Sequence, residues 1–187
     1  MQNIVEKGRS MIEMLGVLAI IGVLSVGGLR IIGQFQSNLK STQMVNDAAD
    51  LARQARKMSR QYDNAYNSEY GYNIYLYKNN AYPKGFTFTG EKFKNAEGVI
   101  YWIDVSDGWF SMEIDNLSDE YCMKLATNDW GTSKSSGIVG VMVNGKDGNG
   151  EKVDELKITT TTFNLTTATD ICDKGTNNDI RLRYTMY

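Results

Sequence analysis

The sequence contains no histidine, a single proline and only two cysteines among its 187 residues. Without histidine, the chain forms neither a Ser-His-Asp nor a Cys-His catalytic arrangement, and it lacks the imidazole that most zinc sites use. The two cysteines do not form a CxxC motif, and two thiols alone make a poor zinc site. We therefore expect no catalytic residues, no metal and no cofactor.

The chain also lacks a large excess of either sign of charge. The 20 basic residues nearly balance the 22 acidic ones, which leaves a formal net charge of −2. A nucleic-acid-binding domain usually carries a basic patch or stripe, so the balance argues against a nucleic-acid partner. The length suits one globular domain with an appendage.

The two cysteines are Cys122 and Cys172. In an oxidising compartment, two cysteines outside a metal or redox motif are expected to form one structural disulfide. Such a bond would close a loop of about 50 residues, for which the chain-entropy model gives about 4 kcal/mol of stabilisation.

The longest apolar run covers residues 11–29 and reads MIEMLGVLAIIGVLSVGGL, interrupted only by Glu13 and Ser25. As a helix it would be about 28 Å long, close to the hydrocarbon thickness of a bilayer. Lys7 and Arg9 precede the run, and these charges favour a cytoplasmic N-terminus with the rest of the chain across the membrane.

Three interpretations compete for this run, and only the third, given in the next paragraph, assigns a role to Glu13. A cleaved secretory signal would have a shorter apolar core, although Ser25-Val26-Gly27 would serve as its cleavage site. A plain membrane anchor explains the length but gives Glu13 no role. A carboxylate in an apolar segment costs about 2.5–3.5 kcal/mol at the membrane centre, so it is treated as a functional group first.

Residues 8–15, GRSMIEML, resemble the class III signal of type IV prepilins, in which glutamate leads an apolar helix. The resemblance implies cleavage between Gly8 and Arg9 by a membrane prepilin peptidase, followed by N-methylation of Arg9. It also implies that Glu13 pairs with the terminal amine of a neighbouring subunit during assembly. Arg9 departs from the family, which usually has Phe or Met at this position.

Beyond the apolar run the pattern becomes amphipathic, and no proline interrupts it before Pro83. We therefore predict one helix from about Ser10 to about Tyr62. The alternative to packing this helix on a sheet is a coiled coil, but no strict heptad is sustained. Its apolar positions recur at helical spacing and are Phe35, Leu39, Val45, Ala48, Ala49, Ala52, Ala55, Met58 and Tyr62. The chain then divides into a leader (1–8), a transmembrane and polymerisation helix (9–34), an amphipathic half-helix (35–62) and a globular head (63–187).

The head begins with a segment rich in Tyr, Asn and Gly, residues 63–97. We predict an irregular connection with one short strand over Tyr72–Tyr77. Its tyrosines either pack on the head or form a surface for lateral contacts or adhesion.

Strand signals dominate the rest of the head, with one short helix between them. The predicted elements are a hairpin of Gly98–Val105 and Trp109–Ile114, a helix over Ser118–Asn128, a fully buried strand over Gly137–Val143, a Thr-rich β segment over Leu156–Leu165 and a terminal strand over Asp179–Tyr187. A long helix followed by strands predicts an α+β fold, with the helix packed on an antiparallel sheet.

Residues 147–151, DGNGE, have the composition of the start of a calcium loop. An EF-hand also needs glycine at its sixth position and glutamate at its twelfth, where this chain has Lys152 and Ile158. We therefore predict a turn without a metal.

The segments Asp115–Cys122 and Leu165–Cys172 resemble those that lead into the two cysteines of type IVb pilins, the toxin-coregulated and bundle-forming type. The resemblance implies a subunit of an extracellular filament for adhesion, aggregation, conjugation or motility. Its partners would be copies of itself, prepilin peptidase and the inner-membrane assembly machinery. It would lie in the inner membrane with a periplasmic head before assembly.

Two alternatives remain open from the sequence. A minor pilin or a type II secretion pseudopilin would share the same N-terminal signal. A membrane-anchored binding domain would share the apolar run but would leave Glu13 unexplained.

Overall fold

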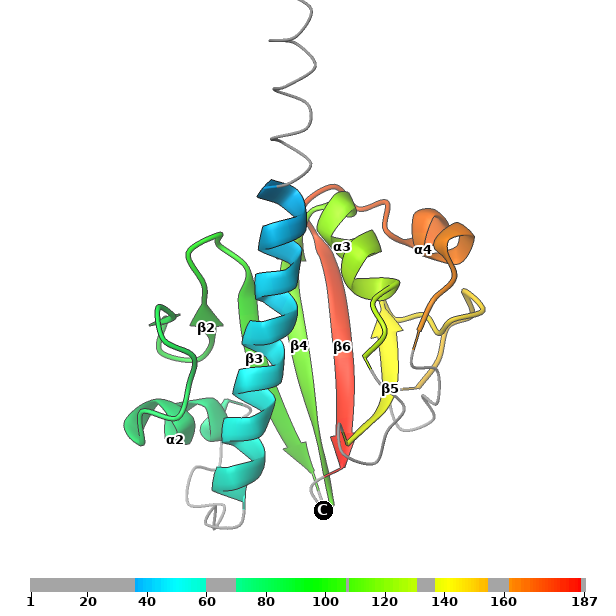
Figure 1. The fold of residues 1–187 in the computed structure, drawn as a ribbon. Coiled ribbons are helices and arrows are strands. Elements are labelled where there is room, and N and C mark those ends of the chain that lie inside the picture. The colour runs from blue at the N-terminus through cyan, green and yellow to red at the C-terminus, as the bar shows by residue number, and fades with distance from the viewer. Residues whose placement is uncertain (1–35, 60–69, 107, 131–136, 155–161, 186–187) are drawn as a thin grey trace, which may run out of the picture. The chain divides into compact units, whose positions relative to one another are not determined.

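The computed structural model describes residues 36–59, 70–106, 108–130, 137–154 and 162–185 (Figure 1). The chain divides into two units, Met1–Thr42 and Gln43–Tyr187. The predicted leader and the transmembrane segment 9–34 lie outside the described residues. Among those that are described, no helix has the length and apolar character needed to cross a bilayer.

The second unit is built on one antiparallel sheet with the strand order β1-β2-β3-β4-β6-β5. Its strands are β1 (Thr87–Phe88), β2 (Phe93–Lys94), β3 (Ile100–Ser106), β4 (Trp109–Leu117), β5 (Ile138–Val143) and β6 (Asn178–Thr185). The predicted hairpin is confirmed as β3–β4, in which Ile103 faces Met112. The described residues thus form an α+β fold, in agreement with the predicted class.

Strand β6 confirms the predicted terminal strand, and buried positions alternate along it with more exposed ones. Ile180, Leu182 and Tyr184 are buried in the core, whereas Arg181 and Arg183 point to the other face of the sheet. Although it is the last strand in the chain, β6 lies inside the sheet between β4 and β5. The sheet therefore cannot be completed until the C-terminal segment is in place.

A helix covers residues 36–59, and its part within the second unit lies along one face of the sheet (Figure 1). Its buried residues share one side of the helix and are Met44, Ala48, Leu51, Ala52 and Ala55. The small alanines allow a close approach between the helix and the sheet.

The predicted apolar stripe of this helix includes two exposed residues and omits two buried ones. Leu39 and Ala49 are exposed, while Met44 and Leu51, which the prediction left out, are buried. The helical period explains the shift, because Ala49 is turned about 100° away from Ala48.

Three short helices complete the described fold: α2 (Gly71–Lys78), α3 (Asp119–Ala126) and α4 (Leu165–Ile171). The prediction of α3 is confirmed, and the Ser118 hydroxyl caps its start by accepting a hydrogen bond from the Tyr121 amide at 3.3 Å. Two other predictions failed, at α2 and at α4.

The strand predicted over Tyr72–Tyr77 is the helix α2. Tyrosine and isoleucine favour strands locally, but helical spacing brings Tyr72 and Leu76 to the same buried side. Tertiary packing therefore overrides local propensity here.

The Thr-rich segment predicted as β ends in a helix, because α4 begins at Leu165. The side chain of Asn164 caps this helix by accepting a hydrogen bond from the Thr167 amide at 2.8 Å. Residues 162–164 form no strand, and 156–161 lie outside the described residues.

The strand predicted over Gly137–Val143 is present as β5, but it is not buried throughout. It forms an edge of the sheet and pairs only with β6. Ile138 and Val139 are partly exposed, whereas residues 140–143 are buried.

Candidate interaction surfaces

The disulfide-closed region joins two helices that are distant in sequence. Cys122 in α3 and Cys172 at the end of α4 lie at disulfide distance, with their sulfurs 2.00 Å apart and their Cα atoms 5.7 Å apart. Both residues are buried. The link fixes α4, which lacks its own place in the sheet, against the helix that follows β4.

A buried polar network holds the same region onto the sheet. Asn178, the first residue of β6, is fully buried, and its amide nitrogen donates to the Leu117 carbonyl at 3.2 Å and to Asp119 Oδ1 at 2.8 Å. Its amide oxygen accepts from Asn144 Nδ2 at 2.8 Å. A buried amide without such partners would cost free energy, so these contacts favour one arrangement of the strand ends.

Asp119 extends this network to the loop that follows the disulfide. Its Oδ1 atom also accepts the Gly175 amide at 2.8 Å. The first-turn carboxylate of α3 therefore serves the loop between α4 and β6 as well as its own helix.

The sheet face opposite the long helix carries paired charges and aromatic rings. Lys92 Nζ lies 4.6 Å from the centroid of the Trp102 ring and 3.4 Å from Asp115 Oδ2. The Trp102 indole nitrogen donates to the same carboxylate oxygen at 3.2 Å. Each of these polar groups therefore has a partner within the chain, and Lys92 also gains a cation–π contact.

Glu113 and Arg181 form the neighbouring ion pair across strands β4 and β6. Burial raises the pKa of Glu113 to about 7; the attraction of Arg181 lowers it and the nearby Asp115 carboxylate raises it further. Burial also raises the pKa of Asp179 on the same face. The shift at Glu113 makes the charge of this face sensitive to mildly acidic pH.

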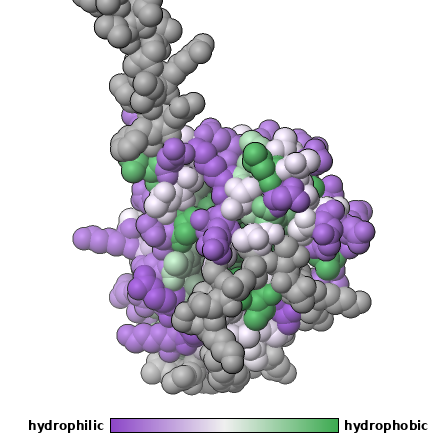
Figure 2. Space-filling view, turned by 45° about the vertical axis from the view of Figure 1, so that its right-hand side comes forward, coloured by the Kyte–Doolittle hydropathy of each residue, from purple (hydrophilic) through white to green (hydrophobic). Residues whose placement is uncertain are grey.

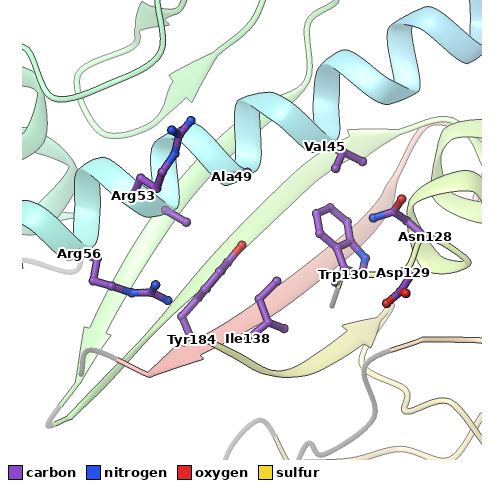
Figure 3. Close-up of a pocket in the computed structure, with 10 residues that line it drawn as sticks. Val45, Ala49, Arg53, Arg56, Asn128, Asp129, Trp130, Ile138 and Tyr184 are labelled. Atoms are coloured by element: carbon purple, nitrogen blue, oxygen red, sulfur yellow. The ribbon is translucent and has the colours of Figure 1, made fainter. Parts of the chain in front are cut away.

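A partly open groove of about 270 Å³ runs between the long helix, the segment after α3 and the start of β5 (Figure 3). The Trp130 indole forms part of its wall and is held by a hydrogen bond to the Leu125 carbonyl at 2.9 Å. The lining residues are Val45, Ala49, Ala52, Arg53, Arg56, Asn128, Asp129, Trp130, Ile138 and Tyr184.

Arg56 closes one end of the groove. Its guanidinium carbon lies 5.8 Å from the centroid of the Tyr184 ring and against Gly137, whose φ is +65°. A Cβ atom at position 137 would require the flexible guanidinium to move aside, and the positive φ is what favours glycine there. Burial raises the pKa of Tyr184, which keeps its hydroxyl neutral.

Two tyrosines of the segment after the long helix make contacts within the head. Tyr72 is buried and donates its hydroxyl to the Ala55 carbonyl, which supports packing. Tyr77 is exposed, and its ring stacks on Phe88 with centroids 4.3 Å apart.

The segment DGNGE forms a turn. Asp147 Oδ1 accepts the amides of Asn149 at 2.9 Å and Glu151 at 3.1 Å, so this carboxylate supports its own loop. Across the described part of the chain, no cluster of three or more acidic or cysteine side chains has metal-site geometry.

The assembly and processing residues of the sequence prediction, Gly8, Arg9 and Glu13, lie outside the described residues. The cysteine pair is brought together, whereas Asn178, Asn144 and the groove had no signal in the sequence pattern. Figure 2 shows the described apolar side chains of one face as small separate patches among hydrophilic ones. No protein-family model, curated protein or solved structure matches the chain.

Proposed function

We propose that this protein is a structural subunit of a type IV pilus-like filament, most similar to the type IVb pilins. The observation that carries the proposal is the position of Glu13, which lies five residues after Gly8 at the start of an apolar run. A carboxylate in such a run needs a partner, and the N-terminus of a neighbouring copy supplies one in a filament.

The proposed route begins in the inner membrane. Prepilin peptidase removes residues 1–8, and the new N-terminus at Arg9 is methylated. The inner-membrane assembly machinery then moves the subunit from the membrane into the filament, with the head outside the cell. No step requires a cofactor or an enzymatic activity of the chain itself.

The fold of the head supports this proposal. The second unit has a helix along one face of an antiparallel sheet, which is the arrangement expected of a pilin head. The cysteine pair and the buried Asn178 network hold the C-terminal region without a ligand. A disulfide of this kind suits a small domain exposed outside the cell.

Filament yield of the full chain tests the proposal. Glu13→Ala should leave membrane insertion intact and strongly reduce the amount of this protein in filaments sheared from cells. Gln2→Ala, within the leader, is the matched control and should leave the yield unchanged. Equal yields of Glu13→Ala and the unsubstituted chain would contradict the pairing role.

The composition of the sheared filaments separates this proposal from the minor pilin and pseudopilin alternatives. A major subunit should be the principal protein of the filament. Traces of the chain in filaments made mainly of another protein would contradict the proposal.

A further inference from the structure

A lysine and an aspartate from different strands meet on the sheet face opposite the long helix. Lys92 directly precedes β2, and its Nζ atom lies 3.4 Å from Oδ2 of Asp115 in β4. Strand β3 lies between β2 and β4, so the two side chains meet across it. Asp115 lies where the pairing of β4 with β6 changes register, and such irregularities redirect side chains. The contact brings an amine to a carboxyl group 23 residues away along the chain.

The surroundings of this pair limit its access to water. The Lys92 side chain is 26% exposed and the Asp115 side chain 20%. The rings of Trp102 and Tyr70 flank the amine, with centroids 4.6 and 5.5 Å from Nζ. The Trp102 indole also donates to Asp115 Oδ2 at 3.2 Å and so holds the carboxyl group in place. Limited access of water favours a reaction that releases water over its reversal.

The Glu113 carboxyl group completes the cluster. Glu113 and Asp115 are two residues apart in β4, which places them on the same face of the sheet, and their side chains interact by a hydrogen bond. Two carboxyl groups form such a bond only when one of them carries a proton. Burial raises the pKa of Glu113 to about 7. A carboxyl group that titrates near neutral pH can both donate and accept a proton in a reaction beside it.

We propose that Lys92 and Asp115 join in an isopeptide bond within the folded head, with Glu113 as the proton-transfer group. The ion pair is the arrangement of the two reactants before the bond forms. An amine held against a carboxyl group reacts as part of one molecule, which removes the cost of bringing the two together.

The reaction is a condensation that needs no other reactant. The Lys92 ammonium gives one proton to the Asp115 carboxylate, and the free amine then attacks Cγ of the resulting carboxyl group. As the C–N bond forms, Glu113 gives its proton to the leaving hydroxyl and takes up a proton from the nitrogen. The C–O bond breaks and one water leaves. One positive and one negative charge disappear, and Glu113 ends as it began.

The bond fastens an edge of the sheet that has few backbone hydrogen bonds. Strands β1 and β2 have two residues each, and β2 pairs with β3 at two positions. A covalent link from Lys92 to β4 holds this edge in place. The inference goes beyond the proposed function, because the bond forms within one head and does not depend on assembly into a filament.

A second lysine–carboxylate pair in the same head provides a matched control. Lys124 Nζ lies 2.8 Å from Glu120 Oε1 in α3, closer than the two atoms of the proposed site. The Glu120 side chain is 57% exposed, so water has ready access to this pair. We expect no bond at this pair, since proximity alone is not sufficient.

Peptide mapping of the full chain, isolated from cells and reduced, tests the bond. Trypsin cleaves after Lys94, between the two linked residues, so the peptides that contain Lys92 and Asp115 should be found joined. Their combined mass should be lower by one water, about 18 Da. Lys92→Arg keeps the positive charge without a nucleophilic amine and should abolish the joined peptide. Lys124→Arg should leave it unchanged.

The rate of bond formation tests the role of Glu113. In samples taken at intervals after synthesis begins, Glu113→Gln should form the joined peptide about 100-fold more slowly than the unsubstituted chain. The Cys122–Cys172 disulfide in the same samples reports that the variant has folded.

Two results would overturn the inference. Separate peptides in the unsubstituted chain, or the same loss of water in Lys92→Arg, would exclude the bond. Equal rates in Glu113→Gln and the unsubstituted chain would exclude proton transfer by Glu113. Both measurements are independent of filament yield, so failure of this inference is distinguishable from failure of the proposed function.

Discussion

The side-chain amide of Asn73 hydrogen-bonds to both backbone groups of Ile103, as a neighbouring strand would. Ile103 N donates to Asn73 Oδ1 at 2.8 Å, and Asn73 Nδ2 donates to the Ile103 carbonyl at 3.1 Å. Strand β2 pairs with β3 only at Ile100 and Tyr101, so it leaves this part of the β3 edge without a strand partner. Asn73 is fully buried and caps the edge from helix α2.

Asn73→Ala should therefore destabilise the head by about 1–3 kcal/mol, because both backbone groups of Ile103 lose their partner in a buried site. Guanidinium unfolding of the full chain in detergent, followed by tryptophan fluorescence, measures the change. Asn46→Ala, on an exposed position of the long helix, is the control and should change stability by less than about 0.5 kcal/mol. Equal effects at both positions would contradict the edge-capping role.

The disulfide should account for a large share of the stability of the head. Replacing both cysteines by serine should lower the free energy of unfolding by about 4 kcal/mol, because the loop of 50 residues is no longer closed in the unfolded chain. A reducing agent should lower the stability of the unsubstituted chain in the same direction and leave the double variant unchanged. Two free thiols in protein isolated from the periplasm would rule out the bond.

The buried carboxyl of Glu113 should make stability depend on pH. Burial raises the pKa of Glu113 from 4.5 to about 7, so the folded state binds a proton more tightly than the unfolded state. The contribution of this proton is fully present below pH 4.5 and is lost as the pH rises toward 7.

Glu113→Gln should remove this part of the pH dependence. The unfolding free energy of the variant should fall less steeply than that of the unsubstituted chain between pH 4.5 and 7. The slopes are compared, because Glu113→Gln also deprives Arg181 of an anion at pH values above 7, where Glu113 is ionised. Parallel curves for the two chains would contradict the raised pKa.

Gly137 has a left-handed backbone angle and lies beside the flexible end of the Arg56 side chain. Gly137→Ala should cost roughly the 1–2 kcal/mol of a left-handed backbone, because the guanidinium can move away from the added Cβ. Gly145→Ala is the matched control and should cost about the same, since Gly145 has a φ of +77° and no atom within 4 Å of its Cβ position. Unfolding free energies of the two variants measure both costs. A much larger cost at Gly137, recovered when Arg56→Ala is added, would contradict this account.

The elements that were predicted well are those with a strong local pattern. The β3–β4 hairpin has a turn between two apolar runs, α3 has the Ser118 cap, and β6 alternates strictly. Each pattern needs only neighbouring residues, so a single sequence is enough to indicate it.

The elements that were missed depend on distant contacts. Helix α2 was predicted as a strand from its local propensity. Its helical form depends on distant contacts, since Tyr72 bonds to the long helix and Asn73 bonds to β3. Asn178 finds its partners on Leu117 and Asp119, about 60 residues away. The groove is likewise lined by four separate segments of the chain, and no local sequence pattern indicates that they lie together.

The first residue of the mature protein tests the central claim most directly. Intact mass and N-terminal sequencing of protein from the cell surface should give a chain that begins at Arg9 with an N-methyl group. That result follows from prepilin processing and places Glu13 fifth in the mature chain. A chain that begins near Gly28 would be a secreted protein without the polymerisation helix, and it would contradict the filament-subunit account.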